Sequence, residues 1–162
     1  MEMLKGRSGG NAMVIDGGDL ENLARLFVRI IDYRSHFTAT HSAGVAAVAG
    51  VLARALGFSA VNCRIIRVAG YLHDLGKLAI PTELIEKPGP LDEVEYLHIQ
   101  DHALQSRRFL ERIPELGHAI EWAAQHHERL DGSGYPEHCT EKEIAFFIFF
   151  IGIVYVISVN ST

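Results

Sequence analysis

The sequence has little cysteine and no excess of positive charge. Its two cysteines, Cys63 and Cys139, stand far apart and in no thiolate spacing, which excludes a zinc ribbon and a disulfide framework and suits a reducing cytoplasm. A formal net charge of -5 gives no basic footprint of the kind that a DNA-binding protein needs. We therefore expect a cytoplasmic protein that does not bind DNA.

Alternating strand patterns and long apolar runs are also scarce. The one long run, residues 144–159, spans 16 residues, fewer than the roughly 20 that cross a hydrocarbon core. We expect no membrane span and interpret this run as a buried last helix whose outer side meets a partner or a missing segment. At 162 residues with 48% apolar content, the chain fits one domain, with residues 1–18 as a flexible leader and residues 19–162 as the domain.

Helical periodicity recurs along the chain and predicts an all-α fold, a compact bundle of about six helices. Gly57, Ser59 and the capping-box pair Asp92 and Glu95 mark helix ends, and the segment from Pro81 to Pro90 breaks the pattern. The expected helices cover residues 19–32, 38–56, 60–76, a long stretch from 92, 114–129, and a last stretch capped by Thr140 and Glu143.

Three of the nine histidines extend apolar helix faces. A buried polar ring without a partner costs about 1 to 3 kcal/mol, so a shared metal ion would satisfy several rings at once. Taken singly, each is more often a core or surface residue than a ligand. The three stripes are His41 with Val45, Val48 and Leu52; His73 with Ile65, Ile66 and Ala69; and His126 with Ala119 and Trp122.

Asp74 adds a hard oxygen that can bridge two divalent ions, and His127 lies beside His126. Mixed nitrogen and carboxylate ligands suit one or two divalent ions, iron or manganese first, with nickel, zinc or magnesium as alternatives. Lys77 also has an ordinary structural interpretation, as the partner of Asp74 three residues earlier in an i,i+3 side-chain pair on a helix. The histidines interpreted as solvent-facing or loop residues are His36, His98, His118 and His138, with His98 on the same helix face as His102.

Four segments resemble the HD-GYP branch of the HD phosphohydrolases, and they occur in the family's order: residues 37–46, 71–81, 87–102 and 126–136. The most specific are YLHDLGKLAIP and HHERLDGSGYP. The resemblance implies a cyclic di-GMP phosphodiesterase with a bimetal centre, in which Asp74 and Lys77 are catalytic and Lys77 contacts the scissile phosphate. The ligand set that it implies is His41, His73, a bridging Asp74, His102, His126 and His127.

The family's name motif is the loop of Asp131, Gly132, Gly134, Tyr135 and Pro136. Taken alone, these residues predict a tight turn fixed by Pro136, with two glycines free to adopt positive φ. The resemblance implies that the loop edges the site or docks a signalling partner of the GGDEF type, which synthesises cyclic di-GMP.

The C-terminal part departs from the family pattern. Tyr155 stands where similar domains have one more metal-ligating aspartate, and no Asp or Glu follows Glu143. Phe37 replaces a glutamate that supports a third metal in some members, and the chain ends at Thr162, before the family's substrate-holding motif. Three hypotheses stay open: an active cyclic dinucleotide phosphodiesterase, a degenerate domain that senses a nucleotide or binds a protein, and an HD phosphohydrolase acting on another phosphoester.

Overall fold

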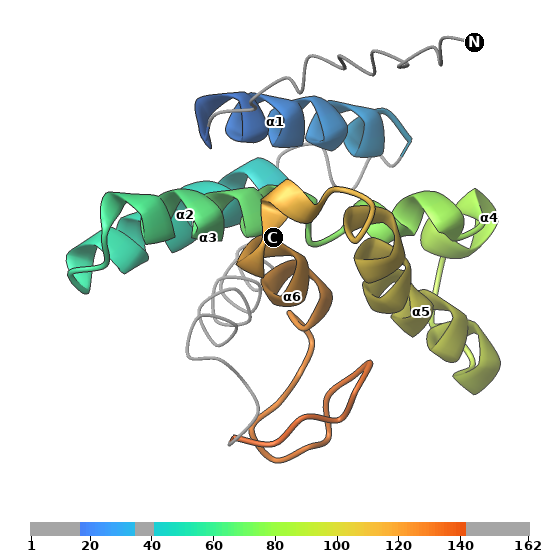
Figure 1. The fold of residues 1–162 in the computed structure, drawn as a ribbon. Helices are drawn as coiled ribbons and strands as arrows, with labels where there is room; N and C mark the ends of the chain where they lie inside the picture. The colour runs from blue at the N-terminus through green and yellow to red at the C-terminus, as the bar shows by residue number, and fades with distance from the viewer. Residues whose placement is uncertain (1–16, 35–40, 142–162) are drawn as a thin grey trace, which may run out of the picture.

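The computed structural model describes residues 17–34 and 41–141 (Figure 1). Its elements are the α-helices α1 (Gly17–Arg34), α2 (His41–Ala55), α3 (Ala60–Leu72), α4 (Thr82–Ile85), α5 (Glu93–Leu110) and α6 (His118–Ala124), with 3-10 helices η1 (Leu75–Ala79) and η2 (Pro114–Leu116). The predicted all-α fold is confirmed. Within the described ranges, one isolated backbone bridge, between Asp131 and Thr140, is the only β pairing, and no helix there is long and apolar enough to cross a membrane.

Helices α2 and α3 lie side by side at the centre of the fold (Figure 1). Small residues line their interface: Ala49 and Ala53 are fully buried, and a Cβ added to Gly70 would lie 2.8 Å from the Cα of Ala46. The two backbones therefore approach closely. This close approach brings His41, at the start of α2, within 5.4 Å of His73, just after α3, measured between ring centroids.

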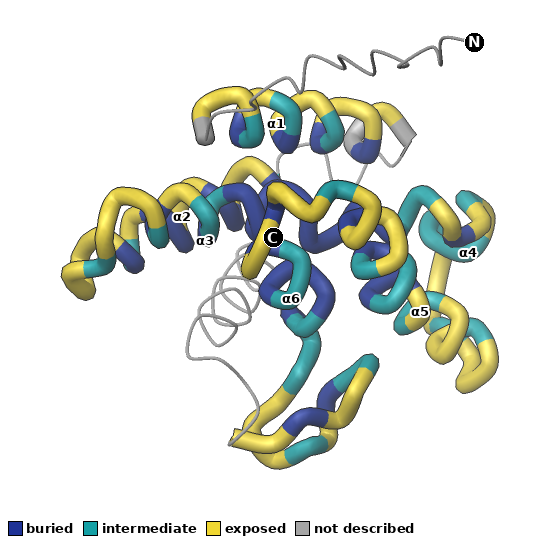
Figure 2. Tube along the Cα trace, in the orientation of Figure 1, coloured by how far each residue is buried: buried dark blue, intermediate teal, exposed yellow. Residues whose placement is uncertain are grey.

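Helix α1 covers this pair with one apolar stripe. Ala24, Val28 and Ile31 recur at helical spacing and are 5% exposed or less, and Figure 2 shows the buried side of α1 turned toward α2 and α3. Glu21 on the same face forms an ion pair with Arg67 of α3. The helix begins at Gly17, two residues before the expected start.

Several predicted helix ends are confirmed. The Ser59 side chain caps α3 by accepting a hydrogen bond from the Asn62 N–H at 3.2 Å. Asp92 and Glu95 form the expected reciprocal capping box at the start of α5. Gly57 follows α2 with a φ of +81°.

Two predicted helices are shorter than expected. The third ends at Leu72, not at residue 76, and the HDLG residues continue into η1. The fifth is divided at Gly117, whose φ of +51° interrupts it, and α6 ends at Ala124, so that His126 and His127 lie beyond a helix rather than on one.

Three further expectations concern individual segments. Helix α4 was not predicted, because it lies within the proline-rich segment. On α2, Val45 is fully buried and Leu52 packs partly buried against the core, as predicted, but Val48 is 42% exposed and Ala49 is the buried residue of that helical turn. The expected last helix, with Glu143 and Tyr155, lies outside the described residues, as do His36 and Phe37.

Candidate metal centre

The six residues predicted to bind metal come together from four parts of the chain: the start of α2, the turn after α3, the middle of α5, and the segment after α6. They form two triads, in each of which the potential ligand atoms lie within 4.8 Å of one another. The first triad consists of His41, His73 and Asp74, and the second of His102, His126 and His127.

The two triads adjoin each other. The ring centroids of His73 and His126 are 4.8 Å apart, and Asp74 Oδ1 lies 3.5 Å from His102 Nε2. Asp74 thus has an oxygen directed at each triad, since its Oδ2 lies 3.3 Å from His73 Nε2. These four side chains are no more than 2% exposed, so the centre is a polar cluster inside the core.

Three of these histidines are oriented by the same kind of contact with the backbone. In each, the ring Nδ1 lies within hydrogen-bond distance of the backbone carbonyl three residues earlier, and because a carbonyl oxygen only accepts, Nδ1 carries the proton. The Nε2 lone pair therefore faces the cluster, as it does in histidines that bind metals. The contacts are His73 to Gly70 at 2.7 Å, His102 to Ile99 at 2.6 Å, and His126 to Ala123 at 2.7 Å.

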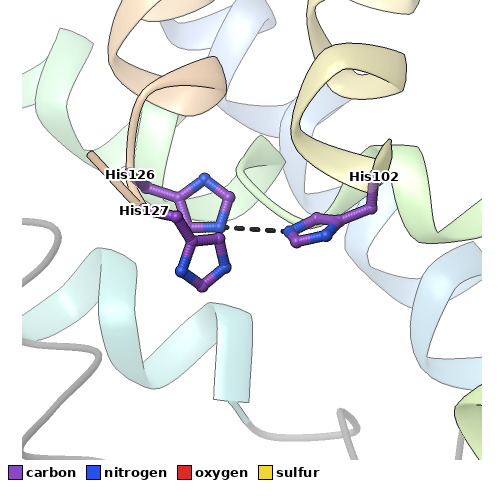
Figure 3. Close-up of side chains that lie close together, drawn as sticks. All are labelled: His102, His126 and His127. Carbon is purple, nitrogen blue, oxygen red and sulfur yellow. Dashed lines mark hydrogen bonds between the residues drawn. The ribbon is translucent and has the colours of Figure 1, made fainter. Parts of the chain in front are cut away.

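This tautomer sets two lone pairs against each other. The Nε2 atoms of His102 and His126 are 3.3 Å apart, as the dashed line in Figure 3 marks. Both Nδ1 atoms hold a proton, so neither Nε2 of the neutral rings has one to donate across this gap. A cation coordinated by both nitrogens converts the repulsion into attraction.

The first triad fits a cation in the same way. His73 Nε2 and Asp74 Oδ1 are buried and have no hydrogen-bond partner among the described residues, an arrangement that costs free energy unless a ligand satisfies them. The residues present therefore fit one or two divalent ions.

Asp74 is held as a carboxylate. Burial, the largest influence, raises its pKa, but the electrostatic influence of neighbouring groups, among them the Lys77 ammonium, outweighs burial and keeps the pKa well below its ordinary value. Lys77 Nζ lies 2.8 Å from Asp74 Oδ2, so the predicted pair between these residues is formed. An anionic oxygen is what a hard divalent ion requires.

The histidines are held neutral. Burial is the largest cause of a lowered pKa at His41, His102 and His126, and the shift is greatest at His126, where neighbouring imidazoles add to it. For His127, burial and then His102 lower the pKa to about 3. Neutral imidazole is the form that binds metal, so protons do not compete for these rings near neutral pH.

The turn that carries His73 and Asp74 is fixed against α5 by Ser106. The buried Ser106 hydroxyl donates to the His73 carbonyl at 2.8 Å and accepts from the Gly76 N–H at 2.8 Å. Gly76 is in direct contact with the α5 backbone, because a Cβ there would lie 1.8 Å from the His102 carbonyl oxygen. Ser106 was not predicted, since a single serine in a helix gives no signal of which residues it contacts.

The loop after α6 closes one side of the centre. Tyr135 stacks on the His127 ring, with centroids 4.5 Å apart and planes 23° from parallel. Gly132 has the expected positive φ of 74°, but Gly134 does not. Gly134 is required for space instead: a Cβ there would lie 2.4 Å from the Arg129 backbone nitrogen.

The remaining predictions concern residues away from the centre. His98, His118 and His138 are exposed, as expected. His118 stacks on Trp122, with ring centroids 5.9 Å apart. Cys63 and Cys139 form no disulfide, as the sequence predicts.

The fold and the site define a helical domain that encloses a cluster of histidines and an aspartate suited to divalent ions. The family model described as HD domain matches residues 25–155. The chain belongs to the HD domain family, in its HD-GYP branch.

Curated relatives are similar over most of this chain. A 3'3'-cGAMP-specific phosphodiesterase 1 of Vibrio cholerae is 42% identical over 118 residues, which cover 73% of this chain and 27% of the relative. The cyclic di-GMP phosphodiesterase response regulator RpfG of Xanthomonas campestris is 39% identical over 76% of this chain and 33% of the relative. The chain therefore spans about a third or less of the length of these relatives.

A solved structure shows the same fold. Bd1817, an HDG"Y"P protein from Bdellovibrio bacteriovorus, superposes with a TM-score of 0.64 and 15% sequence identity, over 89% of this chain and 53% of that one. The likeness supports the helical architecture.

Proposed function

We propose that this chain is a metal-dependent phosphodiesterase domain that hydrolyses a cyclic dinucleotide, either cyclic di-GMP or 3'3'-cGAMP. One observation carries the proposal: the six candidate ligands converge, and three of them have Nε2 turned inward by a backbone carbonyl. The names of the relatives support the substrate class.

The two triads would hold the ions, with Asp74 between them. Mixed nitrogen and carboxylate ligands favour iron or manganese, ahead of nickel, zinc or magnesium. When bound, such ions supply Lewis acidity, which neutralises charge on phosphoryl oxygens and makes water more acidic.

The chain's own residues would bind and orient the substrate. Lys77 is 21% exposed, and its ammonium group would contact the scissile phosphate while it remains beside Asp74. The exposed part of the loop after α6 would meet either the dinucleotide or a GGDEF-type signalling partner.

The proposal is tested by loading the purified chain with Mn²⁺ or Fe²⁺, measuring the ions bound per chain, and assaying hydrolysis of cyclic di-GMP and 3'3'-cGAMP. We expect bound ions and turnover of one dinucleotide or both, and loss of both properties in Asp74→Asn. A chain that binds neither ion, or that binds ions but cleaves neither dinucleotide, contradicts the proposed activity.

A second candidate function is a regulatory domain that binds a nucleotide or a protein without cleaving it. Among the six clustered residues Asp74 is the only carboxylate, and Tyr155, outside the described residues, stands where the family has a further aspartate. One carboxylate offsets little of the charge of two divalent ions, which favours one firmly held ion. Tyr155→Asp is expected to raise the number of ions bound per chain. Binding of a cyclic dinucleotide without its hydrolysis by the unchanged chain would support this second candidate.

A further inference from the structure

The loop after α6 contacts the ring of His127. His73, His102 and His126 each direct Nδ1 at a backbone carbonyl within their own helical turn. His127 has the Tyr135 ring stacked on its face, with ring centroids 4.5 Å apart. The position that the loop gives Tyr135 therefore contributes to the orientation of this candidate ligand.

The loop returns to the segment from which it starts. The Tyr135 N–H donates to the His127 carbonyl at 3.3 Å. Gly134 packs on the backbone of Glu128 and Arg129, with no room for a Cβ. These contacts help to hold the Tyr135 ring over His127.

Glu128 closes this loop with its side chain. Its Oε1 accepts the Glu137 N–H at 2.6 Å, and its Oε2 accepts the Cys139 N–H at 2.9 Å. Both carboxylate oxygens thus bind backbone donors that lie 9 and 11 residues further along the chain. Hydrogen bonds to an ionised acceptor are stronger than neutral ones. Glu128 therefore joins the start of the loop to its end, and Tyr135 lies between the two joined parts.

The far side of the loop is attached to two helices. Glu137 Oε1 lies 2.9 Å from Arg107 of α5, and its Oε2 accepts from Gln125, just after α6, at 2.7 Å. Glu128, Glu137 and Cys139 also lie close enough to count as a group that could hold an ion. The carboxylates of Glu128 and Glu137 are already bound by N–H groups and by Arg107. We therefore interpret this group as a structural contact that holds the loop closed.

We propose that Glu128 is a positioning residue for His127: its carboxylate folds the loop so that Tyr135 holds the imidazole toward His102 and His126. This inference rests on the proposed function, because it assumes that His127 binds an ion. Glu128 itself would not contact the ion. Its effect passes through the loop backbone and the Tyr135 ring.

The test compares Glu128→Ala and Tyr135→Ala with Tyr135→Phe, which keeps the stacked ring. The matched control is Glu141→Ala, which removes an exposed carboxylate from the same loop. Two measurements are made: the affinity and visible absorption spectrum of added Co²⁺, and hydrogen exchange of the loop amides in the ion-free chain. The first reports ligand geometry at the ion, and the second reports closure of the loop.

We expect Glu128→Ala and Tyr135→Ala to weaken Co²⁺ binding by about 10- to 100-fold, the range found when residues that support a metal ligand are removed, and to change the spectrum. In Glu128→Ala, exchange at Glu137 and Cys139 should also accelerate. Tyr135→Phe and Glu141→Ala should keep the wild-type spectrum and affinity. A residue that only stabilised the fold would lower the free energy of unfolding without altering the spectrum.

Wild-type Co²⁺ affinity and an unchanged spectrum in Glu128→Ala would overturn this inference and leave the proposed function intact. So would unchanged amide exchange at Glu137 and Cys139. A wild-type chain that bound no ion at all would instead overturn the inference and the proposed function together, and the two failures are therefore distinct.

Discussion

The two sides of the metal centre are supported by different kinds of contact. On the side of His73 and Asp74, buried helix packing and the Ser106 hydroxyl hold the backbone, and the ligand side chains are fully buried. On the side of His127, an exposed loop is held by side-chain bonds from Glu128 and Arg107. Because local opening is easier where few buried contacts are lost, we expect the first side to open only when the helices unfold and the second to open more readily. We therefore expect substitutions in the loop to change ion affinity with the least effect on the stability of the helices.

The largest effect is expected on the helix side, from Gly76→Ala. The added Cβ would lie 1.8 Å from the His102 carbonyl oxygen, and backbone cannot yield as a flexible side chain can. We expect a loss of about 3 kcal/mol or more in the free energy of unfolding, measured by urea denaturation. Gly44→Ala is the control, since nothing lies within 4 Å of a Cβ there, and it should be neutral or slightly stabilising.

The next effect concerns the residue between the triads. Asp74→Asn keeps the shape but removes the charge, so ion affinity should fall by at least about 100-fold. Asp101→Asn, an exposed change on α5, should bind ions as the wild type does. Metal analysis after dialysis against Mn²⁺ measures the ions bound per chain in both variants. Wild-type ion content in Asp74→Asn would show that the second triad binds alone.

A smaller effect is expected from Ser106→Ala, which removes both bonds that join the turn after α3 to α5. The His73 carbonyl and the Gly76 N–H would be left buried without this partner, at a cost of about 1 to 3 kcal/mol in the free energy of unfolding. Ser133→Ala, in the exposed loop, should cost less than about 0.5 kcal/mol. Equal losses in the two variants would mean that the two sides do not differ as described.

The last effect, the smallest when counted per pH unit, is a dependence of the free energy of unfolding on pH in the ion-free chain. The pKa of His127 is about 3 in the folded state, against an ordinary 6.5, so the unfolded chain binds more protons between these values. The free energy of unfolding should therefore be highest above about pH 6.5 and fall as the pH is lowered toward 3, by at most about 1.4 kcal/mol per pH unit for this group. Denaturation series from pH 7 to pH 4 should show a shallower fall in His127→Gln. A stability that rose on acidification would contradict the neutral state of these rings.

Much of the fold was predictable because its signals are local. Ser59 and the pair Asp92 and Glu95 cap helices by contacts three residues away, which sequence spacing reveals. The six candidate ligands were found from apolar stripes and from the resemblance. The helix ends near the site were not found: α3 stops at Leu72, and the turn that follows packs through Gly76 against the backbone of α5, a contact with His102, 26 residues further along the chain.

Local patterns of residues are enough to identify the side chains available to the site and the starts of most helices, since helical periodicity and capping depend on neighbours along the chain. The packing of the chain sets the direction of each imidazole, the contact of Ser106 with the turn that carries Asp74, and the closure of the loop by Glu128. These depend on contacts between residues distant in sequence, which helical spacing does not encode. Residue types thus indicate which chemistry is available, and the packing of the helices sets its geometry.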